Sequence, residues 1–344
     1  MTNSKELQAP INTTLLRKLG WNGSFANQLA GMASAGKNVV RVISVQRSSF
    51  LVSDGEREWL CKASGTLLHA EDGGYPVTGD WALVRDAVVY DIIPRKNLLS
   101  RGAAGSRGSQ TGIASREQAI AANIDTVFIV CGLDRDFNVR RVERYLTLVY
   151  NCGLIPVIVL TKCDLHEDPE SCCAEVESVA FGVPIVLSSS LDGRGKSEVE
   201  SHLGSGQTVA MLGSSGAGKS TLANMLYGSD IQTTGAVSES VGKGRHLTTT
   251  REMIPMPQGG MLMDNPGIRE IAFFEDGQGV EAAFPEIQAL AHSCRFSDCT
   301  HTVEPGCAVV HAAGAGELDA GRLESYQKMK REMEYLSARQ GKSA

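Results

Sequence analysis

The fold of this chain is decided by one glycine-rich stretch, Gly213-Ser214-Ser215-Gly216-Ala217-Gly218-Lys219-Ser220-Thr221. The stretch follows an apolar run, 208–212, and opens a segment of helical pattern, 219–226. Between a strand and a helix, a Gly-x4-Gly-Lys-Ser pattern forms a loop whose backbone N–H groups converge on phosphate. Lys219 then contacts the β- and γ-phosphate oxygens, and the Ser220 hydroxyl ligates Mg²⁺. The alternative, a chance match in a turn rich in Gly and Ser, leaves the strand and the helix unexplained.

A candidate base-reading motif, Thr161-Lys162-Cys163-Asp164, lies upstream and directly follows the apolar run 154–160. This places it at the carboxyl edge of a strand, where open α/β sheets bind their ligands. A carboxylate there accepts two hydrogen bonds from guanine, whereas adenine would leave Asp164 desolvated and unpaired. The motif therefore predicts GTP as the nucleotide. A serine triplet after the next predicted strand favours a second loop at the base. The candidate base contacts are Thr161, Lys162, Asp164, Ser188 and Ser189.

A candidate metal motif, Asp264-Asn265-Pro266-Gly267, comes after both of these. Asp264 is expected to hold the Mg²⁺ of Ser220 through a water molecule, and the Gly267 N–H is expected to contact the γ-phosphate. The polar loop 242–250 lies between the phosphate loop and this motif, and its composition suits a segment that orders around a γ-phosphate. One of three threonines in that loop should complete the metal shell. We favour Thr249 over Thr248 and Thr250.

The residue that positions the attacking water is less obvious. Ile268 follows Gly267 where a GTPase of the familiar kind carries a water-positioning Gln, and isoleucine cannot orient water. Arg245 and His246 in the polar loop are the candidates, and His246 has the suitable pKa range and hydrogen-bonding reach. The alternative is that His246 contacts a partner or packs. A missing Gln predicts slow intrinsic turnover that a partner accelerates.

The order of these motifs is base recognition, then phosphates, then metal, which is a rotation of the usual GTPase order. Because the ends of a fold often lie close together, such a rotation leaves a site intact. The sequence therefore predicts a circularly permuted P-loop GTPase domain. Apolar runs alternating with helical patterns predict a parallel sheet covered on both faces. The predicted strands are 126–131, 154–160, 184–187 and 208–212, and the predicted helices are 139–150, 174–180 and 219–226.

Four potential metal ligands form a cluster near the end of the chain, with the pattern Cys294-x4-Cys299-x-His301-x5-Cys307. Three thiols and one imidazole form a closed set that suits a tetrahedral, structural Zn²⁺. Disulfides are not expected in a reducing compartment. His292 and His311 lie nearby, but we do not count them as ligands. Downstream, apolar residues at three- and four-residue spacing predict an amphipathic helix. They are Leu323, Tyr326, Met329, Met333 and Leu336.

Length and composition predict a multi-domain α/β protein. A chain of 344 residues is too long for one average domain, and 42% hydrophobic residues suffice for buried cores. Short β-branched runs separated by Gly, Asp and Pro predict a small β-barrel of the OB type. The predicted domains are a 1–36 N-terminal extension with one short helix near 14–19, a 37–100 OB-fold barrel, a 101–117 linker, a 118–278 GTPase domain and a 279–344 zinc-binding helical domain.

The charge and the ends of the chain narrow the functional class. A formal net charge of −6 argues against an indiscriminate nucleic-acid binder, although local basic patches stay compatible with RNA contacts. Candidate patches are 95–96, Arg101 and 328–331, with a solvated face as the alternative. No apolar run has the length that spans a bilayer, and 1–10 lacks an export signal. The cytoplasm is therefore the expected compartment.

Taken together, the motifs resemble the RsgA/YjeQ family of small-ribosomal-subunit-dependent GTPases over roughly 20–340. The resemblance implies an OB-fold that binds 16S rRNA, a zinc domain that contacts the ribosome, and GTP hydrolysis stimulated by the 30S subunit late in its assembly. It also implies that His246 positions the water, and we expect a monomer. Two departures are Asn265, where Ser or Thr is usual, and Leu247, which interrupts a run of His and Thr and leaves the metal-ligating threonine open.

Three competing functions remain at this point. A nucleotide-gated RNA-binding module would survive the loss of turnover. A permuted GTPase serving another RNA, such as the large subunit, is disfavoured by the barrel and the zinc cluster. An ATPase is disfavoured by Asp164. Because the chain runs from the metal motif into the zinc domain within about twenty residues, we also hypothesise that the γ-phosphate reorients that domain.

Overall fold

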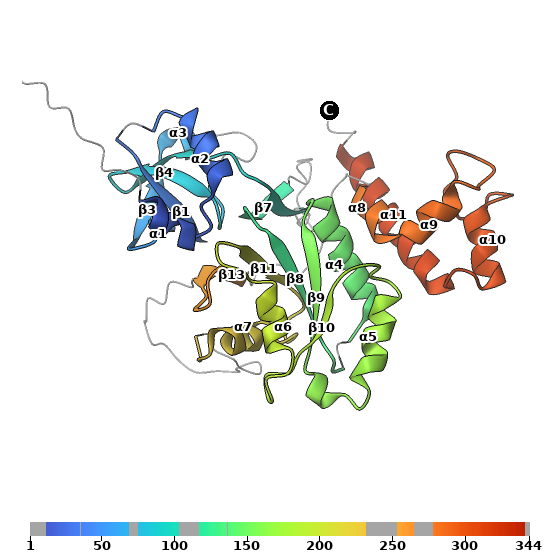
Figure 1. The fold of residues 1–344 in the computed structure, drawn as a ribbon. Helices are drawn as coiled ribbons and strands as arrows, with labels where there is room; N and C mark the ends of the chain where they lie inside the picture. The colour runs from blue at the N-terminus through green and yellow to red at the C-terminus, as the bar shows by residue number, and fades with distance from the viewer. Residues whose placement is uncertain are drawn as a thin grey trace, which may run out of the picture.

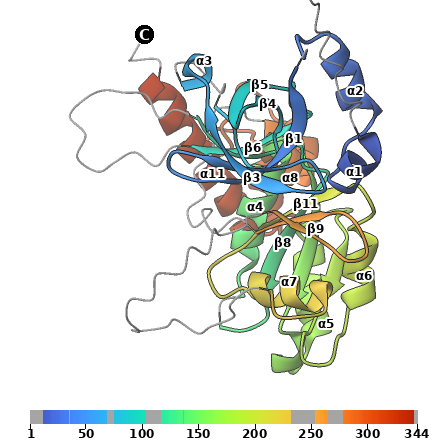
Figure 2. The ribbon, with the colours of Figure 1, turned by 90° about the vertical axis from the view of Figure 1, so that its left-hand side faces the viewer.

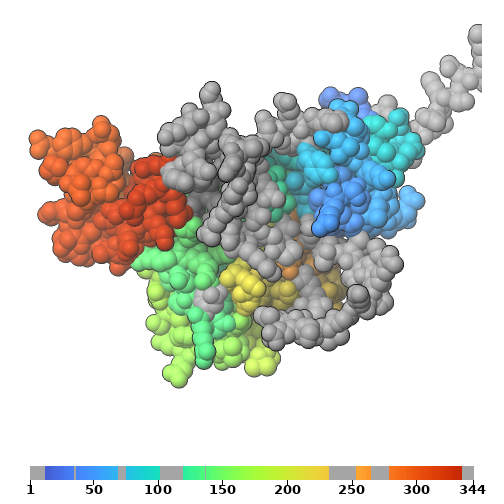
Figure 3. Space-filling view, turned by 180° about the vertical axis from the view of Figure 1, so that it is seen from behind, coloured from blue at the N-terminus to red at the C-terminus, as the bar shows by residue number. Residues whose placement is uncertain are grey.

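The computed structural model describes residues 12–34, 36–68, 75–102, 117–135, 137–231, 253–264 and 278–340. Three regions follow one another along the chain: a β-barrel, an α/β domain with a central sheet, and a set of C-terminal helices (Figure 1). The multi-domain α/β prediction is therefore confirmed. In the space-filling view, the C-terminal helices and the barrel lie on opposite sides of the α/β domain (Figure 3). No helix among the described ranges is both long and apolar enough to cross a membrane.

Two short helices precede the barrel, α1 (Thr13–Lys18) and α2 (Gly23–Ala30). The sequence predicted only the first. The Asn22 side chain accepts hydrogen bonds from two N–H groups of the first turn of α2, which satisfies donors that a helix start leaves open. Phe25 of α2 packs against Trp81 of the barrel, with ring centroids 5.9 Å apart. A helix of two turns depends on such tertiary burial more than on its own propensity, so its pattern alone was too weak to predict it.

The barrel is closed by five strands in the order β1-β2-β3-β5-β4. A short helix, α3 (Gly65–Leu68), lies between β3 and β4. The parallel pairing of β3 with β5, among otherwise antiparallel pairs, completes a five-stranded barrel of the predicted OB type. The strands are β1 (Asn38–Val45), β2 (Phe50–Ser53), β3 (Glu58–Ala63), β4 (Trp81–Arg85) and β5 (Val88–Ile92).

The α/β domain contains a six-stranded sheet in the order β10-β9-β8-β11-β13-β12 (Figures 1 and 2). Its first five strands are parallel, and four of them, β8, β9, β10 and β11, are the predicted ones; β12 pairs antiparallel with β13 at the edge. The sequence did not anticipate β12, which is only three residues long. The strands are β8 (Thr126–Gly132), β9 (Ile155–Thr161), β10 (Ile185–Leu187), β11 (Thr208–Leu212), β12 (Met253–Pro255) and β13 (Met261–Asp264).

Helices cover both faces of this sheet, as the apolar strands predicted. One apolar core joins α4 (Val139–Asn151) and α5 (Pro169–Glu177) to one face, and a second core joins α6 (Lys196–Ser201) and α7 (Lys219–Tyr227) to the other. Helix α5 begins five residues earlier than predicted. It starts there because the Asp168 side chain accepts a hydrogen bond from the Ser171 N–H. The proline at the first helical position also suits a helix start, because it lacks the N–H that would have no partner within the helix.

The barrel and the sheet share one continuous core. A two-stranded sheet of β6 (Leu98–Gly102) and β7 (Glu117–Ala122) joins them in the chain. The buried Arg41 side chain donates to the carbonyls of Leu19, Gly79 and Asn123, which belong to the N-terminal helices, the barrel and the segment leading to β8. Burial lowers the pKa of Arg41 to about 10, so the guanidinium stays charged at neutral pH. At Gly79 a methyl group would overlap the Ala122 carbonyl and the Met263 side chain, so the barrel approaches β13 closely.

The C-terminal region consists of four helices, α8 (Gln278–Ala283), α9 (Pro285–Ala291), α10 (Ala308–Ala315) and α11 (Ala320–Gln340). The amphipathic prediction for α11 is confirmed, because four of its predicted apolar residues are buried; the side chain of Leu336 lies outside the described residues. The four are Leu323, Tyr326, Met329 and Met333.

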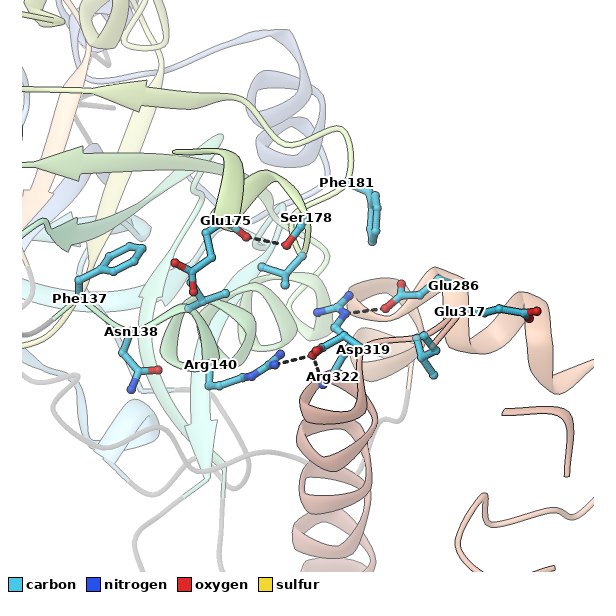
Figure 4. Close-up of a pocket in the computed structure, with 13 residues that line it drawn as sticks. Phe137, Asn138, Arg140, Glu175, Ser178, Phe181, Glu286, Glu317, Asp319 and Arg322 are labelled. Atoms are coloured by element: carbon cyan, nitrogen blue, oxygen red, sulfur yellow. Dashed lines mark hydrogen bonds and ion pairs between the residues drawn. The ribbon is translucent and has the colours of Figure 1, made fainter. Parts of the chain in front are cut away.

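A buried ion pair attaches these helices to the α/β domain. Arg322 of α11 donates to Glu143 of α4 at 2.7 Å and to Glu286 of α9 at 2.5 Å, and its other nitrogen donates to the Ala283 carbonyl. Glu143 is fully buried and Arg322 is 3% exposed. Beside this pair, the Arg140 guanidinium donates a hydrogen bond to the Asp319 carboxylate. Both residues line a cavity of about 640 Å³ between the two regions (Figure 4).

We expect Arg322→Met to lower the free energy of unfolding by about 1.5–3 kcal/mol, because it removes one of two guanidinium partners from the buried Glu143 carboxylate, which keeps its contacts with Arg140 and Ser325. Urea denaturation followed by circular dichroism measures this loss. The matched control is Arg194→Met, which removes an exposed pair with Glu170 and should cost at most about 1 kcal/mol. Equal losses for the two variants would contradict the buried pair's role.

Candidate functional site

The predicted nucleotide motifs lie at one edge of the sheet. Strands β9, β8 and β11 are neighbours and run parallel, so their carboxyl ends meet at the same edge. The base-reading motif starts at the last residue of β9, and the phosphate loop follows β11. In the register, Thr161 of β9 stands opposite Gly132, the last residue of β8. The two motifs are therefore separated by the width of a single strand.

Two hydrogen bonds join the base-reading motif to the phosphate loop. The Thr161 hydroxyl donates to the Ala217 carbonyl at 2.5 Å, and the Lys162 ammonium donates to the Gly216 carbonyl at 2.7 Å. Both motifs line one cavity of about 240 Å³, to which the base-reading motif contributes Asp164 and the phosphate loop contributes Gly218 and Thr221. The convergence that the sequence predicted is thus present. The cavity is lined by Thr161, Lys162, Asp164, Leu165, Ser188, Ser190, Gly218, Thr221, Leu222 and Met225.

The phosphate loop has the geometry of an anion site. Gly218 has φ +92° and is the N-cap residue of α7, and a glycine has no side chain that could occupy the backbone N–H groups of the first turn. At Gly213 a methyl group would overlap the Val130 carbonyl, so the loop leaves β11 in close contact with β8. The Lys219 ammonium lies over the loop and donates to the carbonyls of Gly213 and Ser214, at 2.8 and 2.7 Å.

Oxygen ligands for a cation lie beside this loop. The Ser220 hydroxyl lies 3.5 Å from a carboxylate oxygen of Asp264, and both side chains are partly exposed. Cis ligands of an octahedral Mg²⁺ with bonds of about 2.1 Å are separated by about 3.0 Å. A hydroxyl and a carboxylate at this distance therefore fit a magnesium site in which Asp264 acts directly or through water.

The serine loop after β10 is held close to the base-reading motif. The Ser188 N–H donates to the Leu160 carbonyl at 2.8 Å, and its own carbonyl accepts from the Cys163 N–H. Ser188 lines the cavity, whereas the buried Ser189 hydroxyl accepts from the N–H of Leu191 within its own loop. Ser190 lines the cavity in its place. The side-chain direction at the end of a strand depends on the turn, which a serine triplet does not define.

Several predicted residues lie outside the described ranges. They include the candidate catalytic residue and most of the predicted γ-phosphate contacts, and their roles stay predictions. These residues are Arg245, His246, Thr248, Thr249, Thr250, Asn265, Gly267 and Ile268.

The sequence also missed cavity residues that the structure supplies. Leu165 directly follows Asp164 and lines the cavity, and its position beside the motif was a usable signal. Leu222 and Met225 line the cavity one and two turns into α7. Their apolar pattern reads as ordinary helix burial, so the sequence held no signal for them. Of the basic candidates, Arg95 is bound to Asp80 at 2.8 Å and Lys96 to Asp125 at 2.7 Å, so both are engaged within the chain.

The predicted cysteine–histidine group is assembled in the C-terminal helices. The ligand atoms of Cys294, Cys299, His301 and Cys307 all lie within 4.8 Å of one another. The sulfurs of Cys294 and Cys307 are 3.8 Å apart, and His301 Nδ1 lies 3.6 and 3.4 Å from them. A tetrahedron with bonds of about 2.3 Å to sulfur and about 2.1 Å to nitrogen has edges of about 3.8 Å between sulfurs and about 3.6 Å between sulfur and nitrogen. The group therefore fits a tetrahedral metal ion.

The surroundings of this group favour a metal over a disulfide. All its cysteines are free thiols. Burial, with the nearby Lys330 ammonium, lowers the pKa of His301, so the neutral imidazole that binds metals is favoured at neutral pH. The Glu304 carboxylate accepts from the N–H groups of Thr300, Thr302 and Val303 and fixes the loop between two ligands.

The sheet, the phosphate loop and the rotated order of the motifs define a circularly permuted P-loop GTPase. A family model described as RsgA GTPase matches residues 92–274. Relatives named small ribosomal subunit biogenesis GTPase RsgA include one from Opitutus terrae, 42% identical over 94% of this chain and 91% of the relative, and one from Syntrophotalea carbinolica, 39% identical over 92% and 89%. The chain belongs to the RsgA GTPase family, and it is a GTP hydrolase.

Solved structures agree with this assignment. The crystal structure of YjeQ from Thermotoga maritima has a TM-score of 0.62 and 28% identity, over 86% of this chain and 98% of that one. The structure of YloQ, described as a circularly permuted GTPase, has a TM-score of 0.58 over 88% of this chain and 96% of that one. At 22% identity, the second supports the fold alone.

We expect Gly213→Ala to weaken GDP binding at least about tenfold, because the new methyl group displaces the loop from the Val130 carbonyl and moves its N–H groups. Fluorescent GDP titration measures the change. The control is Gly314→Ala in α10, where a methyl group meets no atom within 4 Å. Unchanged affinity in the Gly213 variant would show that the loop does not set phosphate binding.

Proposed function

We propose that this GTPase acts in the late assembly of the small ribosomal subunit and that the 30S subunit stimulates its GTP hydrolysis. The relatives' names support the first part, because they describe small ribosomal subunit biogenesis GTPases. The observation that carries the proposal is the convergence of Asp164 and the phosphate loop on one cavity in a member of that family. The missing water-positioning Gln supports a partner-stimulated mechanism.

In this proposal, separate residues bind the base, the phosphates, the metal ion and the attacking water. Asp164 reads the guanine edge, with Thr161, Lys162, Ser188 and Ser190 around it. The phosphate loop binds the triphosphate through its N–H groups and Lys219. Mg²⁺ supplies a charge that the phosphate oxygens share, and the residues that would hold it are Ser220, Asp264 and Thr249. Gly267 contacts the γ-phosphate, and His246 positions the attacking water.

The two other regions contact the partner in this proposal. The OB-type barrel binds 16S rRNA, and a structural Zn²⁺ on Cys294, Cys299, His301 and Cys307 shapes the C-terminal helices for the ribosome. The protein works as a monomer in the cytoplasm. Because the chain continues from Asp264 toward α8, γ-phosphate contacts are proposed to reorient the zinc domain and change ribosome affinity.

Turnover experiments test the proposal. Purified 30S particles should raise GTP turnover at least about tenfold over slow intrinsic turnover, because a partner completes the water-positioning site. His246→Ala should remove most of the stimulated rate and keep GDP affinity. Phosphate release with 30S, with 50S and alone measures these rates. Equal turnover in all three would exclude the ribosomal partner, and full activity of the His246 variant would exclude that residue.

Metal removal tests the zinc site. We expect one Zn²⁺ per chain. Cys307→Ser should abolish Zn²⁺ binding, because the tetrahedral site loses one of its four ligands and with it the folding free energy that metal binding supplies. Elemental analysis gives the stoichiometry, and far-ultraviolet circular dichroism with a chelator reports the loss of helix. Cys173→Ser, outside the group, should keep the metal. Full helical content after metal removal would contradict a structural role.

A further inference from the structure

A carboxylate with no assigned role lies between the two nucleotide motifs. Asp134 comes two residues after β8, the strand that separates β9 from β11 at the carboxyl edge. One of its oxygens lies 2.5 Å from the ammonium of Lys162, and both side chains are 30% exposed. Asp134 is not among the residues that line the nucleotide cavity, whereas Lys162 is. The carboxylate therefore acts on the site through the lysine.

The lysine is held in an unusual and well-defined conformation. Lys162 has φ +59°, in the left-handed region that few residues other than glycine adopt. Its stem passes over the end of β8, where its Cδ would lie 3.5 Å from a Cβ placed on Gly132. Its ammonium then reaches both Asp134 and the Gly216 carbonyl of the phosphate loop. The Lys162 side chain thus runs from the end of β9 across the end of β8 to the loop after β11, and two acceptors hold its ammonium in place.

Fixing this side chain in advance affects nucleotide binding. A free lysine side chain loses up to about 2 kcal/mol of rotamer entropy when it is ordered. If the ion pair orders Lys162 before the nucleotide arrives, the binding step does not carry that cost. The hydrogen bond from the Lys162 ammonium to the Gly216 carbonyl also holds the phosphate loop against the base-reading motif after β9. Both effects act on the base and the first phosphates, which GDP and GTP share.

We propose that Asp134 is a positioning residue for guanine nucleotide binding: it holds Lys162 as a fixed wall of the cavity and as the link to the phosphate loop. The inference rests on the proposed role of Lys162 in the base site. It assigns Asp134 to affinity rather than to hydrolysis, because Asp134 is paired with the Lys162 side chain, which lies on the base side of the site.

The direction in which nucleotide affinity changes when Asp134 is replaced separates a positioning role from a purely electrostatic one. Removing the carboxylate takes a negative charge away from an anionic ligand, which by itself would tighten nucleotide binding. Loss of the ordered lysine weakens it. Weaker binding in the variant therefore identifies positioning as the dominant effect.

The test compares Asp134→Ala and Asp134→Asn with the wild-type chain. Asp134→Ala should weaken GDP and a non-hydrolysable GTP analogue equally, by roughly three- to tenfold. Turnover at saturating GTP should stay within about twofold of wild type, since the affected contacts are shared by bound substrate and transition state. Asp134→Asn keeps an acceptor for the lysine and should recover part of the loss. Glu170→Ala, which breaks an exposed pair with Arg194, is the matched control and should bind normally.

A second measurement separates positioning from base reading. Asp164→Asn should shift preference from guanine toward xanthine nucleotides, whereas Asp134→Ala should keep the guanine-to-xanthine ratio of the wild type. Unchanged or tighter GDP binding in Asp134→Ala overturns the inference, and so does a fall in saturated turnover with GDP affinity unchanged. If the wild-type chain itself binds no guanine nucleotide, the proposed function fails instead, and the two failures are distinguished by that one titration.

Discussion

The nucleotide site depends on the adjacency of three parallel strands, β9, β8 and β11. Parallel neighbours end at a common edge, so residues that follow different strands become neighbours whatever their order in the chain. The Thr161 hydroxyl reaches the Ala217 carbonyl only because one strand separates them. A rotated motif order changes the loops between strands and leaves the strand order of the site intact. The permutation is therefore a change of connectivity, and the site itself is built as in any open α/β sheet.

The two added regions are attached to this sheet by different physical means. The barrel joins it through apolar packing, with Gly79 against Met263, the residue before the candidate metal ligand Asp264, and through the bond from the Arg41 guanidinium to the Asn123 carbonyl. The C-terminal helices join it through a buried ion pair, Glu143 with Arg322. Apolar contacts tolerate small shifts, whereas a buried ion pair requires one geometry to offset desolvation. We infer that the ion pair fixes the orientation of the C-terminal helices on α4.

Local motifs made much of the site predictable from the sequence. The phosphate loop, Asp164 and the cysteine–histidine group are defined by spacing within a few residues, and the structure brings each set together. What the sequence missed depends on contacts between distant segments. Helix α2 is stabilised by packing on Trp81, and β12 exists only as a partner of β13. Asp134 lies just after β8 in no recognisable motif, and its proposed role depends on the ion pair with Lys162, 28 residues away.

The connection between Asp264 and α8 shows what the permutation adds. Asp264 ends β13 in the sheet, and Gly279 at the start of α8 donates to the Asn151 side chain of α4 at 2.7 Å. Both ends of residues 265–277 are thus anchored on the same α/β domain. For the γ-phosphate to reorient the C-terminal helices, its contacts must favour the new state by more than the cost of opening the Glu143–Arg322 pair. Reversing a 1:99 equilibrium needs about 5.5 kcal/mol of differential binding. Nucleotide contacts alone would have to supply that on top of a buried ion pair, so the proposed reorientation requires a second source of free energy, for which we propose the binding of the reoriented helices to the ribosomal partner.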